Sequence, residues 1–211
     1  MSEKQYDAIV IGAGVIGCAI AFELARKGYK TVNIDRQPDA GHGSTSNSCA
    51  IVRAHYSTWD GVAMAYEGFF YWKDWERYLG VEDERGFARY MNTGTILLKT
   101  KGHDHQKVLD LYRELGVEHE VWDLDTLKER MPIYAQDSYY PPKLPDDPHF
   151  FDEPTDVLEG AIYTPGSGYV NDPQLATHNL RRAAEHHGSE FMFNSEIVEV
   201  RRDAERVQGV T

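Results

Sequence analysis

One stretch near the start of the chain, residues 6–35, limits the possible folds more than any other. An apolar run of strand length leads into Gly12, Gly14 and Gly17, which have the spacing G-x-G-x-x-G. A helical pattern and a second apolar run follow, and that run ends in Asp35. This order predicts one βαβ unit that binds a dinucleotide.

Each glycine of the motif has a separate physical role. Gly12 permits a tight turn, Gly14 lets the backbone approach a pyrophosphate, and Gly17 lets the helix lie close to the sheet. The helix that begins at about Gly14 directs its unpaired N–H groups and the positive end of its dipole toward the phosphates. The predicted phosphate-binding residues are Gly12, Gly14, Val15, Ile16 and Gly17.

Asp35 lies about 20 residues after the glycines, at the expected end of the second strand, where its carboxylate can accept hydrogen bonds from ribose hydroxyls. A carboxylate there disfavours a 2′-phosphate, so NADP is the least expected dinucleotide. A glycine triplet alone can be only a turn, but the strand, helix and Asp35 around it all agree. The motif does not separate FAD from NAD.

Composition narrows the class of protein. The formal net charge is −12 over 211 residues, and no basic stripe is present, so nucleic-acid binding is not expected. No secretory leader is recognisable, and the longest apolar stretch, residues 8–20, is too short to span a bilayer. With only Cys18 and Cys49, no disulfide framework is proposed. We expect a cytoplasmic protein without a transmembrane segment.

The nine histidines give no metal-binding signature, because none lies in an HExxH motif or a Cys/His box. The pairs His103 with His105 and His186 with His187 lie in polar sequence that flanks predicted helices. No metal site is therefore predicted.

A polar loop, residues 41–57, follows the second predicted strand. Its small side chains supply many hydrogen-bonding groups with little bulk, which suits close contact with a polar ligand. A solvated linker is the alternative, but Ile51 and Val52, followed by Arg53 and Tyr56, are not typical of one. The polar candidates for cofactor contact are Ser44, Thr45, Ser46, Asn47 and Ser48.

After this loop the βαβ rhythm is lost. The pattern predicts helices over 60–79, 104–115, 124–130 and 173–187, and strands within 86–100 and at 190–193, 196–202 and 206–211. The aromatic residues of the first of these helices are expected to be core. These elements suggest an antiparallel sheet inserted into the nucleotide domain.

Residues 133–156 are rich in Pro, Asp and aromatics and have no periodicity. Long irregular segments of compact domains are commonly lids, binding loops or subunit contacts. A disordered acidic loop is the competing interpretation.

Taken in order, the chain resembles the N-terminal half of the FAD-dependent D-amino acid oxidase superfamily, particularly its sarcosine oxidase, dimethylglycine dehydrogenase and glycine oxidase branches. The resemblance covers nearly the whole chain and rests on five segments. They are residues 7–28, Asp35 with Arg36, the loop GSTSNSCAIVRAHYS, the pattern DLDTLKERMP and residues 160–191.

The resemblance implies an α/β fold: a Rossmann-type FAD-binding domain with an inserted, mostly antiparallel α+β substrate domain. We expect residues 1–85 and 155–211 to form the FAD domain, incomplete here, and residues 86–154 to begin the substrate domain. Because complete members are much longer, the chain is expected to be a fragment, or a subunit that a second chain or a homo-oligomer completes. Alone it should have weak or no activity and exposed sheet edges.

The resemblance also implies roles for single residues. Arg36 joins Asp35 at the cofactor, and Arg53, with Tyr56 in an R-x-x-Y setting, binds the substrate carboxylate. A structural salt bridge is the alternative role of Arg53. Some relatives carry a histidine in a GSTxH setting that bonds covalently to the flavin, whereas this chain has Asn47 there. Non-covalent FAD is therefore expected at this position, and a covalent link elsewhere stays open.

The implied activity is FAD-dependent oxidation of the C–N bond of an amino acid or N-methyl amino acid, by hydride transfer to flavin N5. A non-catalytic FAD-binding module is the second hypothesis. An NAD-dependent dehydrogenase is the third, and the polar loop and the lost βαβ rhythm argue against it.

Overall fold

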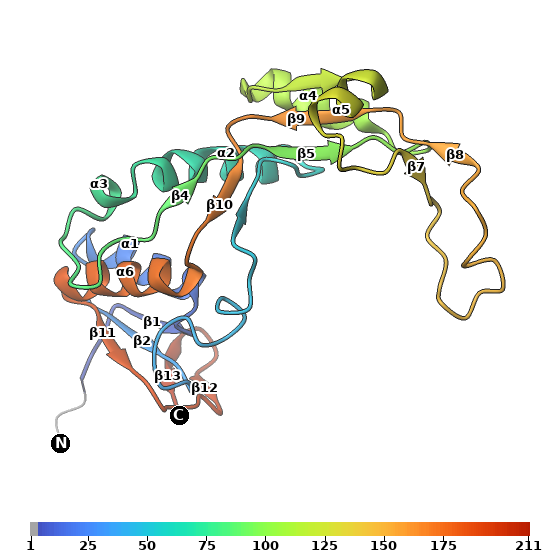
Figure 1. Ribbon diagram of the computed structural model, residues 1–211. Coiled ribbons are helices and arrows are strands. Elements are labelled where there is room, and N and C mark those ends of the chain that lie inside the picture. Colours follow the sequence, from blue (N-terminus) through green and yellow to red (C-terminus); the bar gives the residue numbers. More distant parts are fainter. Residues whose placement is uncertain (1–3) are drawn as a thin grey trace. The chain divides into compact units, whose positions relative to one another are not determined.

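The computed structural model describes residues 4–211, which form two compact units that are each discontinuous in sequence (Figure 1). The first unit contains the described residues up to Ile51, together with Tyr71–Met91 and Tyr169–Thr211. The second unit contains Val52–Phe70 and Asn92–Gly168. Each unit has its own sheet and helices, so the chain crosses between them several times.

The first unit is built on a parallel sheet in the order β1-β2-β11. The strands are β1 (Ala8–Ile11), β2 (Thr31–Ile34) and β11 (Glu190–Met192). The central strand, β2, pairs Val32 with Ile9 on one side and with Glu190 on the other. All four residues of β2 are buried, as expected for the middle strand of a covered parallel sheet. The predicted βαβ unit is confirmed.

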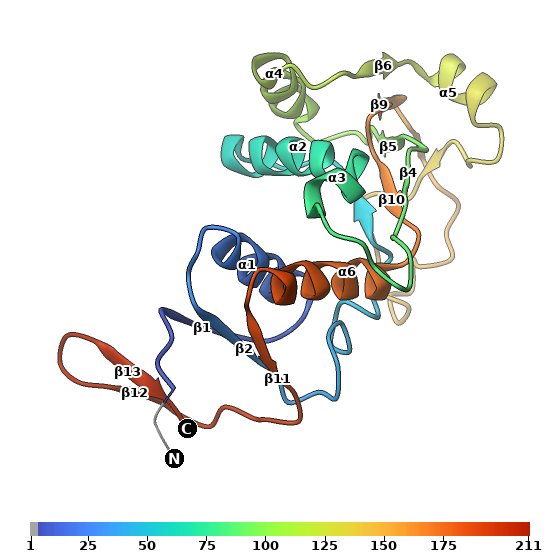
Figure 2. The ribbon, with the colours of Figure 1, turned by 90° about the vertical axis from the view of Figure 1, so that its left-hand side faces the viewer.

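Two helices, α1 (Val15–Ala25) and α6 (Pro173–His186), pack side by side over this sheet (Figure 2). Small buried side chains let the two helices approach closely. α6 begins as the sequence predicts, with Pro173 in its first turn and Asp172 Oδ1 accepting a 2.8 Å hydrogen bond from Leu175 N–H. The small residues are Gly17, Cys18, Ala21, Ala25, Ala176, Ala183 and Ala184.

The predicted continuous helix over 60–79 is two helices, α2 (Trp59–Lys73) and α3 (Trp75–Leu79), because the backbone at Asp74 leaves the helical region (φ −122°, ψ 48°). The aromatic run is also less buried than predicted. Trp75 is buried, but Phe70 is 52% exposed. Aromatic residues at consecutive positions point to all sides of a helix, so one packed face cannot cover them all.

The second unit contains an antiparallel sheet in the order β5-β9-β6. Its strands are β5 (Thr95–Leu98), β9 (Ala161–Thr164) and β6 (Glu120–Trp122), with Ile162 opposite both Leu97 and Val121. This confirms the predicted second sheet. A further short sheet has the order β3-β10-β4, with β3 (Ile51–Val52), β10 (Gly168–Val170) and β4 (Tyr90–Met91).

The helices of the second unit, α4 (His105–Leu115) and α5 (Leu124–Arg130), follow the predicted bounds. Asp104 caps α4 by accepting from Gln106 N–H at 3.1 Å, and Gly116 ends it with φ 70°. Two apolar clusters form the core. One comprises Ala54, Val62, Val108, Leu109, Tyr112, Val117 and Ile162, and the other comprises Trp122, Leu127, Leu158 and Ala161.

The segment 133–156 is a long excursion that starts and ends beside a short strand pair, β7 (Asp137–Ser138) with β8 (Asp156–Val157) (Figure 1). Between these strands the chain has turns but no helix or strand. Phe151, at 88% exposed, shows that its aromatic side chains are not all packed.

The chain closes with a hairpin, β12 (Val200–Arg202) and β13 (Val207–Val210). β12 is shorter than the predicted strand over 196–202, and residues 195–197 line a cavity instead. In the part of the chain that the structure describes, no helix combines the length and apolarity needed to cross a bilayer.

Candidate dinucleotide site

A cavity of 400 Å³ lies in the first unit at the carboxyl ends of β1 and β2. Ligands of open parallel sheets bind at this edge, because the turns that follow neighbouring strands meet there. The lining residues come from four separate segments of the chain. They are Ile11, Gly12, Gly14, Ile34, Asp35, Arg36, Gln37, Gly43, Ser44, Ser195, Glu196 and Ile197.

The glycine turn has the geometry that its spacing predicts. Gly12 has φ +99°, a conformation that side-chain-bearing residues rarely adopt. A Cβ on Gly17 would lie 1.9 Å from the carbonyl oxygen of Gly12, so only glycine lets the helix approach the turn this closely. A Cβ on Gly14 would lie 3.1 Å from Thr45 Oγ1. Any larger residue at Gly17 must displace the backbone.

The first turn of α1 is arranged to receive an anion. Its N-cap residue, Gly14, has extended backbone and makes no side-chain capping bond. Val15 N–H donates to Thr45 Oγ1 at 3.1 Å, and Thr45 is 9% exposed. The polar loop therefore contacts the start of α1. The positive end of the α1 dipole is directed toward the position expected for the pyrophosphate.

Asp35 is fixed by two backbone donors. Its Oδ2 accepts from Ala13 N–H at 2.5 Å and its Oδ1 accepts from Gln37 N–H at 2.8 Å. Each carboxylate oxygen has a second lone pair, so the group can still accept ribose hydroxyls from the cavity. The carboxylate is therefore oriented in advance.

The cavity is also lined by Ser195, Glu196 and Ile197, which the sequence analysis did not predict. Ser195 N–H donates to Asp35 C=O at 3.0 Å, which turns the chain after β11 back over the end of β2. Glu196 Oε1 lies 3.7 Å from Arg36 Nη1, and both side chains are largely exposed. The missed signal was strand direction: a third parallel strand brings its carboxyl end to the same edge.

The predicted cofactor contacts in the polar loop, residues 41–57, fall into two groups. Ser44 lines the cavity and Thr45 binds Val15, whereas the next three side chains bond within the loop. Ser46 Oγ donates to Gly43 C=O at 2.8 Å, Asn47 Nδ2 donates to the same oxygen at 3.4 Å, and Ser48 Oγ accepts from Ala50 N–H at 2.9 Å. These last three shape the loop and do not line the cavity.

The predicted substrate clamp, Arg53 with Tyr56, belongs to the second unit. Arg53 Nη1 donates to His55 C=O at 2.8 Å, and its guanidinium carbon lies 5.4 Å from the centroid of the Tyr56 ring. Among the described residues no carboxylate pairs with Arg53, so the structural salt bridge considered from the sequence is not formed. Its guanidinium fork is free to bind a carboxylate.

His55 lies next to this arginine and was not singled out from the sequence. Burial lowers the pKa of His55, and the positive charges of Arg53 and His105 lower it further. Its Nδ1 is buried without a hydrogen-bond partner among the described residues. A neutral imidazole therefore accompanies the guanidinium.

Comparison with known proteins decides the family. The family model described as "DAO: FAD dependent oxidoreductase" matches residues 7–211. The chain belongs to this family. The resemblance inferred from the sequence is confirmed, and FAD is supported as the cofactor, which argues against the NAD-dependent dehydrogenase alternative.

Relatives of this FAD-dependent oxidoreductase chain differ in their named activities. It is 27% identical to a "Sarcosine oxidase subunit beta" of Arthrobacter sp, over 99% of this chain and 47% of the relative. It is also 27% identical to a "Glycerol 3-phosphate dehydrogenase" of Caloramator mitchellensis, over 94% of this chain and 37% of the relative. The chain thus spans less than half the length of these curated relatives.

Among solved structures, the glycine oxidase from Bacillus cereus ATCC 14579 matches 98% of this chain and 51% of its own, with a TM-score of 0.65 and 20% identity. At this identity the likeness concerns the fold, and it confirms the predicted α/β class with an antiparallel second sheet.

Proposed function

We propose that this chain supplies the FAD-binding part and one substrate-binding group of an enzyme that oxidises the C–N bond of an amino acid or N-methyl amino acid. The observation that carries the proposal is the cavity lined by Gly12, Gly14, Asp35 and Ser44, which are residues expected to contact the ADP half of FAD. The family match supports FAD as its occupant.

Named residues would hold the cofactor. The start of α1 at Gly14, Val15 and Ile16 would bind the pyrophosphate, and Asp35 would accept hydrogen bonds from the ribose. Arg36 and the backbone of Glu196 would border the adenine. Bound FAD supplies a hydride acceptor, and the protein orients the substrate toward it.

Non-covalent binding at the polar loop is part of the proposal. The amide of Asn47 cannot form the bond that a histidine forms there in some relatives, and its Nδ2 donates to Gly43 C=O. Ser46 and Ser48 keep the loop folded, and Ser44 contacts the cofactor directly. The sequence prediction assigned residues 1–85 and 155–211 to FAD and residues 86–154 to substrate. We assign these roles instead to the first unit and to the second unit, because Val52–Phe70 and residues 155–168 belong to the second unit.

Arg53 is the proposed carboxylate clamp. Its exposed guanidinium has no carboxylate partner among the described residues and lies against the Tyr56 ring, which limits its motion. Planar bidentate recognition suits the carboxylate of an amino acid. The named activity of the sarcosine oxidase relative supports such a substrate.

An absorption spectrum of the purified protein tests the proposal. Flavin bands that bleach when sarcosine or glycine is added under anaerobic conditions support it, and a protein without flavin contradicts it. Arg53→Lys should weaken substrate binding at least about tenfold while flavin is retained, because a single ammonium cannot replace the bidentate fork. Loss of flavin with unchanged substrate affinity would overturn the role of Arg53.

A second candidate function is a non-catalytic FAD-binding module that acts with a second chain. It is favoured by the name of one relative, "Sarcosine oxidase subunit beta", which describes a protein that acts with other subunits. Flavin bands that no amine bleaches, with activity restored by a partner chain, would support this candidate.

A further inference from the structure

A buried histidine outside the dinucleotide cavity has a ring that makes no hydrogen bond with the described residues. His178 lies in α6 and is 6% exposed. Neither of its ring nitrogens has a hydrogen-bond partner among the described residues. Buried polar atoms are nearly always hydrogen-bonded, so an unpaired imidazole of this kind requires a ligand or another cause.

Two carboxylates face this imidazole from the connection between α3 and β4. His178 Nε2 lies 3.4 Å from Asp83 Oδ1 and 3.8 Å from Glu84 Oε1. One ligand atom from each of the three residues lies within 4.8 Å of the others. The Asp83 side chain is fully buried, whereas that of Glu84 is 63% exposed. The group is thus open to solvent on the Glu84 side.

The carboxylate of Asp83 is held by hydrogen bonds that leave a second lone pair on each of its oxygens. Asn179 Nδ2 donates to Asp83 Oδ2 at 2.7 Å, and Arg85 N–H donates to Oδ1 at 2.9 Å. Asn179 itself is fixed, because its Oδ1 accepts from Ala88 N–H at 3.0 Å and from Trp75 Nε1 at 3.3 Å. Outer partners of this kind orient the ligands of metal sites.

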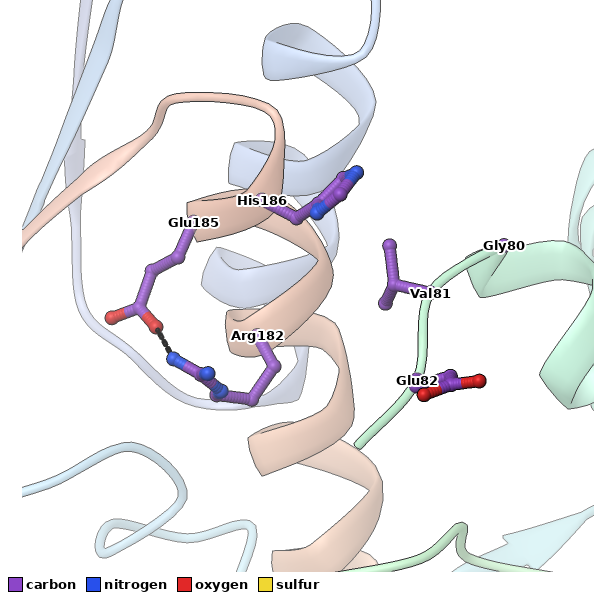
Figure 3. A pocket seen from close by; sticks show the side chains of 6 residues that line it. All are labelled: Gly80, Val81, Glu82, Arg182, Glu185 and His186. Carbon is purple, nitrogen blue, oxygen red and sulfur yellow. Dashed lines mark hydrogen bonds and ion pairs between the residues drawn. The ribbon is translucent and has the colours of Figure 1, made fainter. Parts of the chain in front are cut away.

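The nearby cations do not occupy the space between the three ligand atoms. Arg182 Nε approaches the other oxygen of Glu84, Oε2, at 3.6 Å. Arg182 Nη1 donates a 2.7 Å hydrogen bond to Glu185 Oε2 (Figure 3). Both residues line a neighbouring cavity of 570 Å³. Asp39, the other acidic residue near His178, pairs with Arg181. Glu84 Oε1 therefore stays available to a ligand.

We propose that Asp83, Glu84 and His178 bind one divalent transition-metal ion, best represented by Zn²⁺. Zinc–ligand bonds of about 2.0–2.2 Å place two ligand atoms of a tetrahedral site roughly 3.3–3.6 Å apart. The separations of 3.4 Å and 3.8 Å from His178 Nε2 are close to this range, and the ligand atoms of the two carboxylates lie within 4.8 Å of each other. One imidazole with two carboxylates favours zinc or manganese over calcium and magnesium, which prefer all-oxygen sites.

The ion would fasten the connection between α3 and β4 to the middle of α6. It would satisfy His178 Nε2 and balance two negative charges at once. Water would complete the coordination on the exposed side. This role is structural and does not depend on the proposed oxidase function.

Isothermal titration of the chelator-treated protein with ZnCl₂, together with elemental analysis after dialysis, tests the site. We expect one equivalent of zinc and a rise of the thermal midpoint. His178→Gln and Glu84→Gln should each weaken zinc binding at least about tenfold, since loss of even an outer-shell partner costs about 10–100-fold. His186→Gln, further along the same helix, is the matched control and should bind zinc like the wild type.

Glu84→Gln keeps the test decisive if His178→Gln fails to fold, because Glu84 is exposed and its amide preserves the side-chain shape. Absence of one-to-one binding by the wild type overturns the proposal. Equal zinc affinity in Glu84→Gln, His186→Gln and the wild type also overturns it, since zinc would then bind at other groups.

Discussion

The first unit pairs parallel strands, β1, β2 and β11, whereas the second unit pairs antiparallel strands, β5, β9 and β6. In the first unit the carboxyl ends meet at one edge, and the glycine turn, Asp35 and residues 195–197 gather there around one cavity. In the second unit neighbouring strands end at opposite edges. Its proposed substrate group, Arg53, lies outside this sheet, directly after the short strand β3 (Ile51–Val52).

The difference has an energetic side. The first unit depends on close backbone approach at its glycine turn, where one added Cβ atom on Gly17 would clash with the carbonyl oxygen of Gly12. The second unit depends on two apolar clusters around Ile162 and Leu127. Substitutions at the glycine turn should change cofactor affinity, and substitutions in the two apolar clusters should change stability without changing cofactor affinity.

The largest expected effect comes from Gly17→Val. The new Cβ would lie 1.9 Å from Gly12 C=O, so the turn must move, at a cost of about 4 kcal/mol in unfolding free energy and with loss of FAD binding. Denaturant unfolding and flavin fluorescence measure both. Gly68→Ala, where no atom lies within 4 Å of the new Cβ, is the control and should leave both nearly unchanged. Retained flavin binding in Gly17→Val would contradict the dependence of the cofactor site on close approach at Gly17.

Leu127→Ala addresses the second unit. Leu127 is 1% exposed in its apolar cluster, so the cavity left behind should reduce the unfolding free energy by about 3 kcal/mol. FAD affinity of the folded protein should be unchanged. If flavin titration showed weaker binding in step with the lost stability, the two units would not be energetically separate.

Asp35→Asn tests whether the carboxylate of Asp35 binds the ribose of FAD. An amide oxygen cannot accept from Ala13 N–H, Gln37 N–H and the ribose as two carboxylate oxygens do, so FAD affinity should fall about tenfold. Glu196→Gln, which changes only an exposed pair with Arg36, should have little effect. Equal flavin dissociation constants for the two variants would contradict the ribose role of Asp35.

The smallest effect concerns Asp39 and pH. Burial opposes ionisation of Asp39, but hydrogen bonding from Ala40 N–H and the charge of Arg181 outweigh it, so the pKa of Asp39 is lowered from 3.8. Its contribution to stability is present above pH 3.8 and is lost as the pH falls through the lower folded-state pKa. Asp39→Asn should cost about 1 kcal/mol at pH 7 and less near pH 3. A difference from wild type that grows on acidification would contradict this assignment.

Sequence reasoning predicted the features that depend on neighbouring residues. The glycine turn, the Asp104 cap with the Gly116 stop, and the start of α6 at Asp172 all follow local backbone rules. The fold class and the antiparallel second sheet were also predictable, from the lost βαβ rhythm and the family resemblance.

Features that depend on distant packing were not predictable in this way. The break at Asp74 carries no proline or glycine. Glu196 reaches the dinucleotide cavity only because β11 lies parallel to β2. His178 meets Asp83 through the packing of α6, and no motif spacing connects them.

The strand order of the first sheet has a consequence for how the protein is made. β2 gains its second neighbour, β11, only after the entire second unit has been translated, since Val52–Phe70 and Asn92–Gly168 both precede β11 in the sequence. During synthesis one edge of β2 therefore emerges from the ribosome without its native partner. The nucleotide-binding edge, although encoded at the start of the chain, is therefore completed only after the second unit has been synthesised.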